Sequence, residues 1–204
     1  MNTEKLEPQD FENERHEIEK HFFIAIVLLF AILLITIFAG ETDAQEKEQF
    51  DFSTSVMEVE NYVTWFHRNV REDRWARAIK IVPVAVEESI KQDFDPLLVA
   101  TIITGESGWR PDVISEDGHN TIGLMQVKPC GVCGKGYNLR TVQGQIQAGV
   151  MCLKMSRERC DGELNQTLTM YASGKCVSKS KRTRRLIKKR IRLYMEAVEV
   201  FRAD

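Results

Sequence analysis

The longest apolar stretch of the chain runs from Phe22 to Ala39, and Thr36 is its only polar side chain. At about 1.5 Å per residue, a helix of this length is close to the thickness of the hydrocarbon core of a bilayer. Each central Leu, Ile, Phe or Val favours insertion by roughly 0.3–0.6 kcal/mol, and no charged residue opposes them. The pattern predicts one transmembrane helix over residues 22–40, preceded by an N-terminal tail over residues 1–21.

The charged residues on either side of this segment predict its orientation. Arg15 and Lys20 precede it, whereas Glu41 and other acidic residues follow it, with Lys47 as the nearest cation. Because basic flanks stay in the cytoplasm, we expect a cytoplasmic tail and a body outside the membrane. The alternative is a signal peptide cleaved near Ala44 and a secreted body, but the long acidic leader and the length of the apolar stretch favour an anchor.

Beyond this segment, an acidic and polar stretch over residues 41–58 is interpreted as a linker, and residues 59–204 are expected to form one globular domain. Apolar spacing predicts helices at about residues 56–82, 84–91, 96–104, 141–159, 164–172 and 180–202. Pro83 is expected to kink or restart the chain between the first two. The Gly-, Pro-, Asp- and Asn-rich stretch 108–136 is expected to form loops with at most short strands. The predicted fold class is therefore mainly α.

One predicted helix is apolar on every side, which is typical of a helix at the centre of a domain. Asp95 is a suitable N-cap, Pro96 is a suitable first helical residue, and the helix reads PLLVATIIT. Glu106 comes at or just beyond its end. A carboxyl among apolar neighbours resists ionisation, so its pKa rises and it can donate a proton near neutral pH. A structural role at the helix end is the alternative, and the local pattern does not decide between the two.

The net charge of −2 hides an uneven distribution, because the first 60 residues carry a net charge of −10 and the remainder +8. Basic residues gather on the last predicted helix, at Lys179, Lys181, Arg182, Arg184, Arg185, Lys188, Lys189, Arg190 and Arg192. We interpret this run either as a solvated helix face or as a surface that attracts anionic polymers or lipid head groups. Nucleic acid is not an expected partner, because the sequence contains no base-reading motif.

The five cysteines lie in the C-terminal half, at Cys130, Cys133, Cys152, Cys160 and Cys176. Outside the cytoplasm they are expected to form disulfides of open connectivity, with at least one thiol unpaired or paired between chains. A zinc site is the alternative, since the first two have a ligand-like spacing and Cys152 and Cys160 would complete four thiolates. The second pair lacks a compact ligand spacing and exported thiols tend to oxidise, so we expect no metal ion.

Four segments carry the evidence for function: DPLLVA at 95–100, ESGWRP at 106–111, GLMQV at 123–127 and YASG at 171–174. In order and spacing they resemble the soluble lytic transglycosylase family, which comprises lysozyme-like enzymes of bacterial walls and of phages. The resemblance extends from about Trp75 to Tyr194. It implies a lysozyme-like fold of the α+β superfamily, an activity on the glycan strands of peptidoglycan, and no cofactor.

In this family one acid serves both steps of a glycan lyase reaction, and the resemblance assigns this role to Glu106. It would protonate the glycosidic oxygen between N-acetylmuramic acid and N-acetylglucosamine. It would then act as base on the muramic 6-hydroxyl, which leaves a 1,6-anhydro end. A hydroxyl held close within the same molecule has a high effective concentration, so a second catalytic carboxylate is unnecessary. The resemblance also implies a catalytic role for Tyr171, whose hydroxyl would lie near the acid.

The resemblance further implies that the glycan groove is lined by Ser107, Gly123, Leu124, Met125 and Gln126. For Leu124 and Met125 the alternative is core packing, for Ser107 a turn cap, and for Gly123 a backbone conformation that glycine tolerates.

Residues 171–174 depart from the family's usual Tyr-Asn-Ala-Gly, because alanine stands in place of the asparagine. Ser173 is expected to replace that contact with the glycan. Cys176 follows this motif directly, and we expect it to pair with Cys152 or Cys160.

Two other functions remain open. A goose-type muramidase, which uses water, would need a second carboxylate, for which Asp112 and Asp117 are candidates. His119 is interpreted as an exposed loop residue. The other alternative is a catalytically weak wall-binding component of a phage virion or secretion apparatus. We expect glycan strands and the inner membrane as partners, a catalytic domain over residues 59–204 in the periplasm, and membership of an envelope-spanning or virion complex as an open question.

Overall fold

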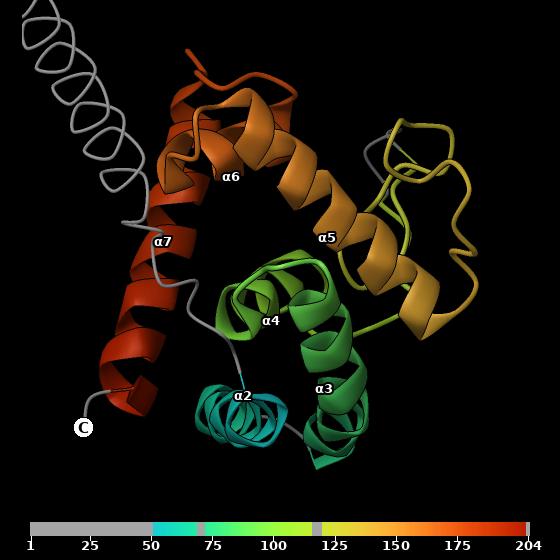
Figure 1. Cartoon of the computed structure of the whole chain (residues 1–204), viewed down its shortest axis with the longest axis vertical. Coiled ribbons are helices and arrows are strands. Elements are labelled where there is room, and N and C mark those ends of the chain that lie inside the picture. Colours follow the sequence, from blue (N-terminus) through green and yellow to red (C-terminus); the bar gives the residue numbers. More distant parts are fainter. Residues whose placement is uncertain (1–50, 69–71, 116–119, 203–204) are drawn as a thin grey trace, which may run out of the picture. The chain divides into compact units, whose positions relative to one another are not determined.

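The computed structural model describes residues 51–68, 72–115 and 120–202. Six helices lie within these residues, and loops connect them (Figure 1). In chain order they are α2 (Phe52–His67), α3 (Glu72–Lys91), α4 (Pro96–Ser107), α5 (Val142–Arg159), α6 (Leu164–Ser173) and α7 (Lys181–Arg202). Within the described residues the only β structure consists of isolated bridges, from Ile122 to Ile114 and to Val127. The predicted mainly α fold, with at most short strands before α5, is confirmed.

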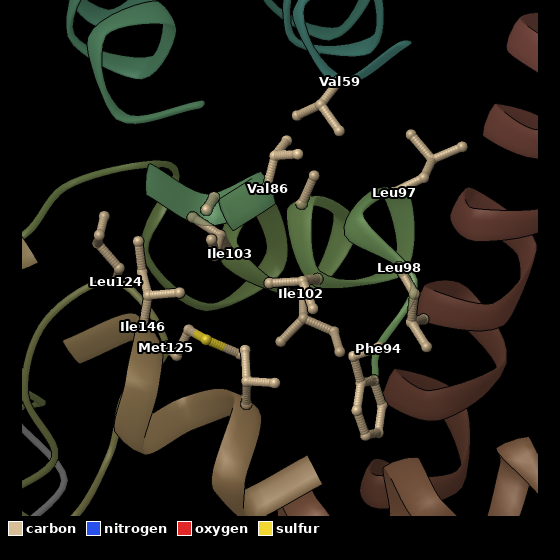
Figure 2. Packing of buried hydrophobic residues seen from close by; sticks show 14 of the residues in the cluster. Val59, Val86, Phe94, Leu97, Leu98, Ile102, Ile103, Leu124, Met125 and Ile146 are labelled. Carbon is tan, nitrogen blue, oxygen red and sulfur yellow. The ribbon is translucent and has the colours of Figure 1, made fainter. Parts of the chain in front are cut away.

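The central helix is α4, which contacts α2, α3 and α7. It begins as predicted, because the Asp95 side chain accepts a hydrogen bond from the Leu97 N–H at 2.8 Å. Figure 2 shows Val59 of α2 and Met125 of the loop between α4 and α5 on opposite sides of α4. Every residue of α4 is buried except Gly105 and Glu106, next to its C-terminal end. The buried helix therefore presents a single ionisable side chain, that of Glu106.

The two termini of α4 are matched by α7, which runs in the opposite direction. Near the end of α7, Arg202 binds the Asp95 carboxylate with both terminal nitrogens, at 2.7 and 2.9 Å, and its Nε lies 3.0 Å from Glu58 of α2. Twelve residues separate Arg202 from Arg190, and eleven separate Asp95 from Glu106. At about 1.5 Å per residue these lengths agree closely, so Arg190 lies beside Glu106.

Three features of the N-terminal half differ from the predictions. The helix predicted over about residues 56–82 is divided between α2, which ends at His67, and α3, which begins at Glu72. The region predicted as a linker, 41–58, overlaps α2, because Asp51 caps a helix that begins at Phe52 and whose Ser55 is already buried. Of the kink or restart predicted at Pro83, the restart is wrong, because α3 continues through this residue. Pro83 removes one backbone donor, but it lies on the exposed face of α3, where water can reach the freed carbonyl, while the buried residues on either side hold the helix against the core.

Two disulfides tie the C-terminal half together. Cys133 of the loop is bonded to Cys152 of α5, and Cys160 at the end of α5 is bonded to Cys176 after α6. Cys160 is one of the two partners predicted for Cys176. Cys130 is the free thiol and is exposed. The alternative of a four-thiolate zinc site is wrong, since three of its four cysteines are used in disulfides.

None of the helices among the described residues is long and apolar enough to cross a membrane. The predicted tail over 1–21, the predicted transmembrane helix over 22–40 and most of the predicted linker lie outside the described residues, as do Asp117 and His119.

Candidate active site

The Glu106 side chain lines a cavity of about 780 Å³ at the C-terminal end of α4. The helix stops there because Gly108 adopts a left-handed conformation, with φ of 59°, and its N–H bonds the Thr104 carbonyl. The walls come from four other parts of the chain: the loop before α5, Cys152 of α5 itself, the end of α6, and α7. We call this hollow the acid cavity. A hollow of this volume is in the range of ligand-binding sites, so it can accept a ligand beside the partly buried acid.

The closest partner of Glu106 is Arg190 of α7, whose Nη2 donates to Glu106 Oε1 at 2.6 Å. Their side chains are 17% and 6% exposed, respectively. Burial raises the pKa of the Glu106 carboxyl, and the charge and hydrogen bond of Arg190 act in the opposite direction without cancelling the effect. Glu106 therefore holds a proton more firmly than an ordinary glutamate, as a general acid requires.

Arg190 is also incompletely satisfied, because its Nε and Nη1 are buried without a hydrogen-bond partner among the described residues. An unpaired buried donor costs about 1–3 kcal/mol, and more when it is charged. The buried, unpaired nitrogens of Arg190 therefore lower the stability of the fold. Such a cost is common where a side chain serves a functional site rather than the fold.

Tyr171 of α6 lies in the wall of the same cavity, and its hydroxyl donates to the Met125 carbonyl at 2.6 Å. Burial raises the pKa of this phenol, and the nearby charge of Glu106 raises it further. The hydroxyl therefore keeps its proton at any physiological pH and cannot act as a base. What it can do is fix the GLMQV loop against α6 and present its remaining lone pair to the cavity.

The GLMQV loop is fixed by hydrogen bonds to the side chain of Gln145 of α5. Its Oε1 accepts from the Leu124 N–H, and its Nε2 donates to the carbonyls of Pro111 and Leu139, each at 2.9 Å. Gly123 has a φ of 75°, and a Cβ at this position would lie 2.1 Å from Gln145 Oε1. Only glycine allows this close approach, so Gly123 serves the backbone of the loop.

The structure divides the predicted groove residues into two groups. Gln126 and Ser173 line the acid cavity. Ser107 is buried and its hydroxyl bonds the Leu124 carbonyl at 2.9 Å, while Leu124 and Met125 are fully buried in the core. The second group, together with Gly123, thus supports the floor under the cavity.

The two cavity residues are themselves constrained. The Gln126 amide accepts from the Thr121 hydroxyl and donates to the Gly123 carbonyl, both at 2.9 Å, so it also braces the loop. Ser173 is exposed and donates to the Thr169 carbonyl at 2.7 Å, which leaves its oxygen able to accept a further hydrogen bond.

Sequence reasoning missed Arg190, because it appears there as one member of the basic run. The signal that distinguishes it is its place on the apolar stripe of α7, three residues after Ile187 and four before Tyr194. A cation on the buried face of a helix needs an acidic partner, and Glu106 is that partner. Lys128, which also lines the cavity, follows the GLMQV motif with no pattern that marks it.

The candidates for a second carboxylate do not join Glu106 in the described part of the site. Asp112 is exposed and lines a different cavity, of about 730 Å³, with Tyr137 and Gln145. Among the described residues, Glu106 is the only carboxylate in the lining of the acid cavity. Asp117 and His119 are outside the residues described.

Comparison with models of protein families identifies the family to which part of this chain is similar. The family model described as "Transglycosylase SLT domain" matches residues 84–192, a range that contains Glu106, the GLMQV loop, Tyr171 and Arg190. No curated protein matches the chain.

Proposed function

Since the chain belongs to the SLT transglycosylase family, whose model matches more than half of it, we propose that it cleaves the β-1,4 bond between N-acetylmuramic acid and N-acetylglucosamine and leaves 1,6-anhydro ends. The family membership supports a lytic transglycosylase-type function on peptidoglycan. The bond that is cut, the product and the residue roles are our proposal.

The observation that carries this proposal is the state of Glu106 in the acid cavity. Its pKa is raised by burial while one oxygen is fixed by Arg190. In the first step the protonated carboxyl gives its proton to the glycosidic oxygen, and the bond from C1 of the muramic residue to that oxygen breaks. The carboxylate that results is stabilised by the Arg190 guanidinium at the moment when negative charge develops on it.

In the second step the Glu106 carboxylate takes the proton of the muramic 6-hydroxyl, and that oxygen forms the new bond to C1. The acid is thereby regenerated and no water is consumed. Because the hydroxyl belongs to the same sugar, its effective concentration can reach the order of 10⁵ M or more, which replaces the second carboxylate of a hydrolase.

Tyr171 and Ser173 are proposed to orient the sugar beside the acid. The Tyr171 phenol accepts a hydrogen bond from the sugar and fixes the GLMQV loop through its own bond to the Met125 carbonyl. Ser173 takes the place of the asparagine that the family motif usually carries. Gln126 and the buried residues beneath it keep the floor of the cavity rigid. Precise positioning is worth several kcal/mol of the barrier, so these supporting contacts affect the rate even where they do not touch the reacting atoms.

We also propose that the domain faces the periplasm and is anchored in the inner membrane through residues 22–40, with release by cleavage near Ala44 as the alternative. The two disulfides support a location outside the cytoplasm, where such bonds persist. Alkaline carbonate washing of membranes provides a test: an anchored chain stays in the pellet, whereas the intact chain or a processed form in the supernatant contradicts the anchor.

The proposal is tested by clearing of purified sacculi with the full chain in detergent, beside Glu106→Gln and Asp112→Asn. Removal of the general acid is expected to lower the rate by a factor of 10² or more. The matched Asp112→Asn change removes an exposed carboxylate from the neighbouring cavity and should leave the rate within about twofold. Loss of activity in Asp112→Asn would instead favour a muramidase with two carboxylates.

A further inference from the structure

A third cavity, of about 690 Å³, lies between α6 and α7. Three cations of α7, Arg184, Lys188 and Arg192, line it at intervals of four residues, which places them along one face of the helix. The opposite wall is formed by Asn165 and Gln166 of α6. Within the described residues no carboxylate takes part in the lining, so the hollow, which we call the basic cavity, is positively charged.

All three cations are exposed, so a ligand can reach them. Arg184 is oriented by its own backbone, because its Nη1 donates to the carbonyls of Ser178 and Lys179 at 3.4 and 3.2 Å, which leaves other guanidinium nitrogens free to donate. Arg192 has only a loose contact with Glu196, at 3.6 Å, and its side chain is 72% exposed. Like charges spaced four residues apart repel one another, so a bound anion would relieve an unfavourable arrangement.

The basic cavity shares both of its helices with the acid cavity. Leu186 and Arg190 face the acid cavity. Arg184, Lys188 and Arg192 face the basic cavity, on the opposite side of α7. A helix is about 10 Å across, and an extended peptide spans about 3.3 Å per residue. The path halfway around such a helix is about 16 Å, so a peptide arm of about five residues on a bound glycan is long enough to pass from one cavity to the other.

We propose that the basic cavity binds the carboxylates of the peptide arms of peptidoglycan, so that the enzyme prefers strands that carry charged peptides. This inference rests on the function proposed above. Guanidinium and ammonium groups beside side-chain amides suit discrete carboxylates that enter a hollow. An anionic membrane surface, in contrast, is attracted to cations wherever they are exposed, whether or not they line a cavity.

The test compares two double variants of the full chain in detergent. Lys188→Gln/Arg192→Gln removes two cations that line the basic cavity. Arg185→Gln/Lys189→Gln removes two exposed cations of the same helix that line none of the cavities described here, so the change in net charge is identical. The substrates are untreated sacculi and sacculi whose peptide carboxylates have been converted to methylamides, which leaves the glycan and the peptides in place.

We expect the lining pair to raise the half-saturating amount of untreated sacculi by about three- to tenfold, without a change in maximal rate, and to make methylamidation nearly ineffective. The other pair should stay within about twofold of the parent chain. Equal effects of both pairs, or no effect of methylamidation on the parent, would overturn the proposal. Weaker binding of the lining pair to phosphatidylglycerol vesicles, with unchanged saturation by sacculi, would assign the cavity to lipid.

Sedimentation of each chain with both kinds of sacculi is measured as well, because binding does not depend on turnover. If the parent chain binds untreated sacculi more tightly than methylamidated sacculi but releases no fragments, the proposed reaction fails and the basic cavity stands. If it releases fragments equally from both, the reaction stands and the cavity proposal fails.

Discussion

Replacement of Arg190 by methionine tests the physical link between the buried cation and the acid. The change removes the guanidinium that donates to Glu106 Oε1 at 2.6 Å and keeps an apolar side chain of similar length on α7. We expect two results from this substitution: a moderate loss of stability, and a shift of the pH profile of activity to higher pH.

The loss of stability can be bounded from the contacts. Removal of one partner of a buried ion pair costs about 3–5 kcal/mol. The cost here is smaller, because Glu106 can take up a proton and because two unpartnered nitrogens of Arg190 disappear, each of which costs about 1–3 kcal/mol. We expect a net loss of about 1–3 kcal/mol at pH 7, or a decrease of roughly 2–10 °C in Tm. Glu106→Ala should lose more, about 3–5 kcal/mol, because a buried guanidinium cannot give up its proton.

The sign of the pH dependence follows from the direction of the pKa shift. Burial already raises the pKa of Glu106, and without Arg190 the pKa rises further. A carboxyl with a raised folded-state pKa stabilises the fold below its unfolded pKa, and this stability is lost as pH rises through the folded pKa. The difference in Tm between the variant and the parent chain should therefore be smaller at about pH 5 than at about pH 7.

The assay is kcat/KM for sacculi as a function of pH, with thermal unfolding measured across the same range. In Arg190→Met the alkaline limb should move to higher pH, because the acid stays protonated longer, and Arg190→Lys should restore much of the parent profile. An alkaline limb that stays in place, or that moves to lower pH, would refute the proposed interaction with the general acid. A variant that loses stability without any shift in the profile would show that Arg190 is only structural.

Further predictions concern the support of the site and the termini. Tyr171→Phe leaves the Met125 carbonyl without its donor, so we expect a loss of about 1–3 kcal/mol in thermal unfolding and a lower kcat. Gly123→Ala forces a Cβ to within 2.1 Å of Gln145 Oε1 at a positive φ, so sacculus clearing should fall with Tm, and a normal Tm would contradict the geometry. Reduction of both disulfides should cost about 3 kcal/mol each in unfolding free energy, as measured with and without dithiothreitol. Deletion of residues 1–40 should move the chain from the membrane fraction to the supernatant.

The sequence predicted the helical part of the fold because its signals are local. Asp95, Pro96 and an all-apolar run define α4, and the position of Glu106 at its end follows from the same run. The prediction failed at Pro83, where local backbone preference favours a break but the buried residues on both sides outweigh it. It also extended the linker into α2, because acidic residues on the exposed face of a helix read as a solvated spacer.

The site was predicted only in part, because its residues meet through tertiary contacts. The motifs single out Glu106 and Tyr171, which both line the acid cavity. Arg190 lies 84 residues from Glu106 and reaches it only because α7 docks antiparallel to α4. Ser107 and Met125 carry the family pattern yet face the core, since the motif records the support of the cavity as well as its lining. A spacing pattern does not separate these two roles.

The most direct test of the central claim is mass spectrometry of the muropeptides that the full chain releases from purified sacculi, beside Glu106→Gln. The account predicts products with 1,6-anhydromuramic ends, each lighter by one water than the hydrolysed equivalent, and their absence in Glu106→Gln. Products with reducing muramic ends, or anhydro products that persist in Glu106→Gln, would contradict it.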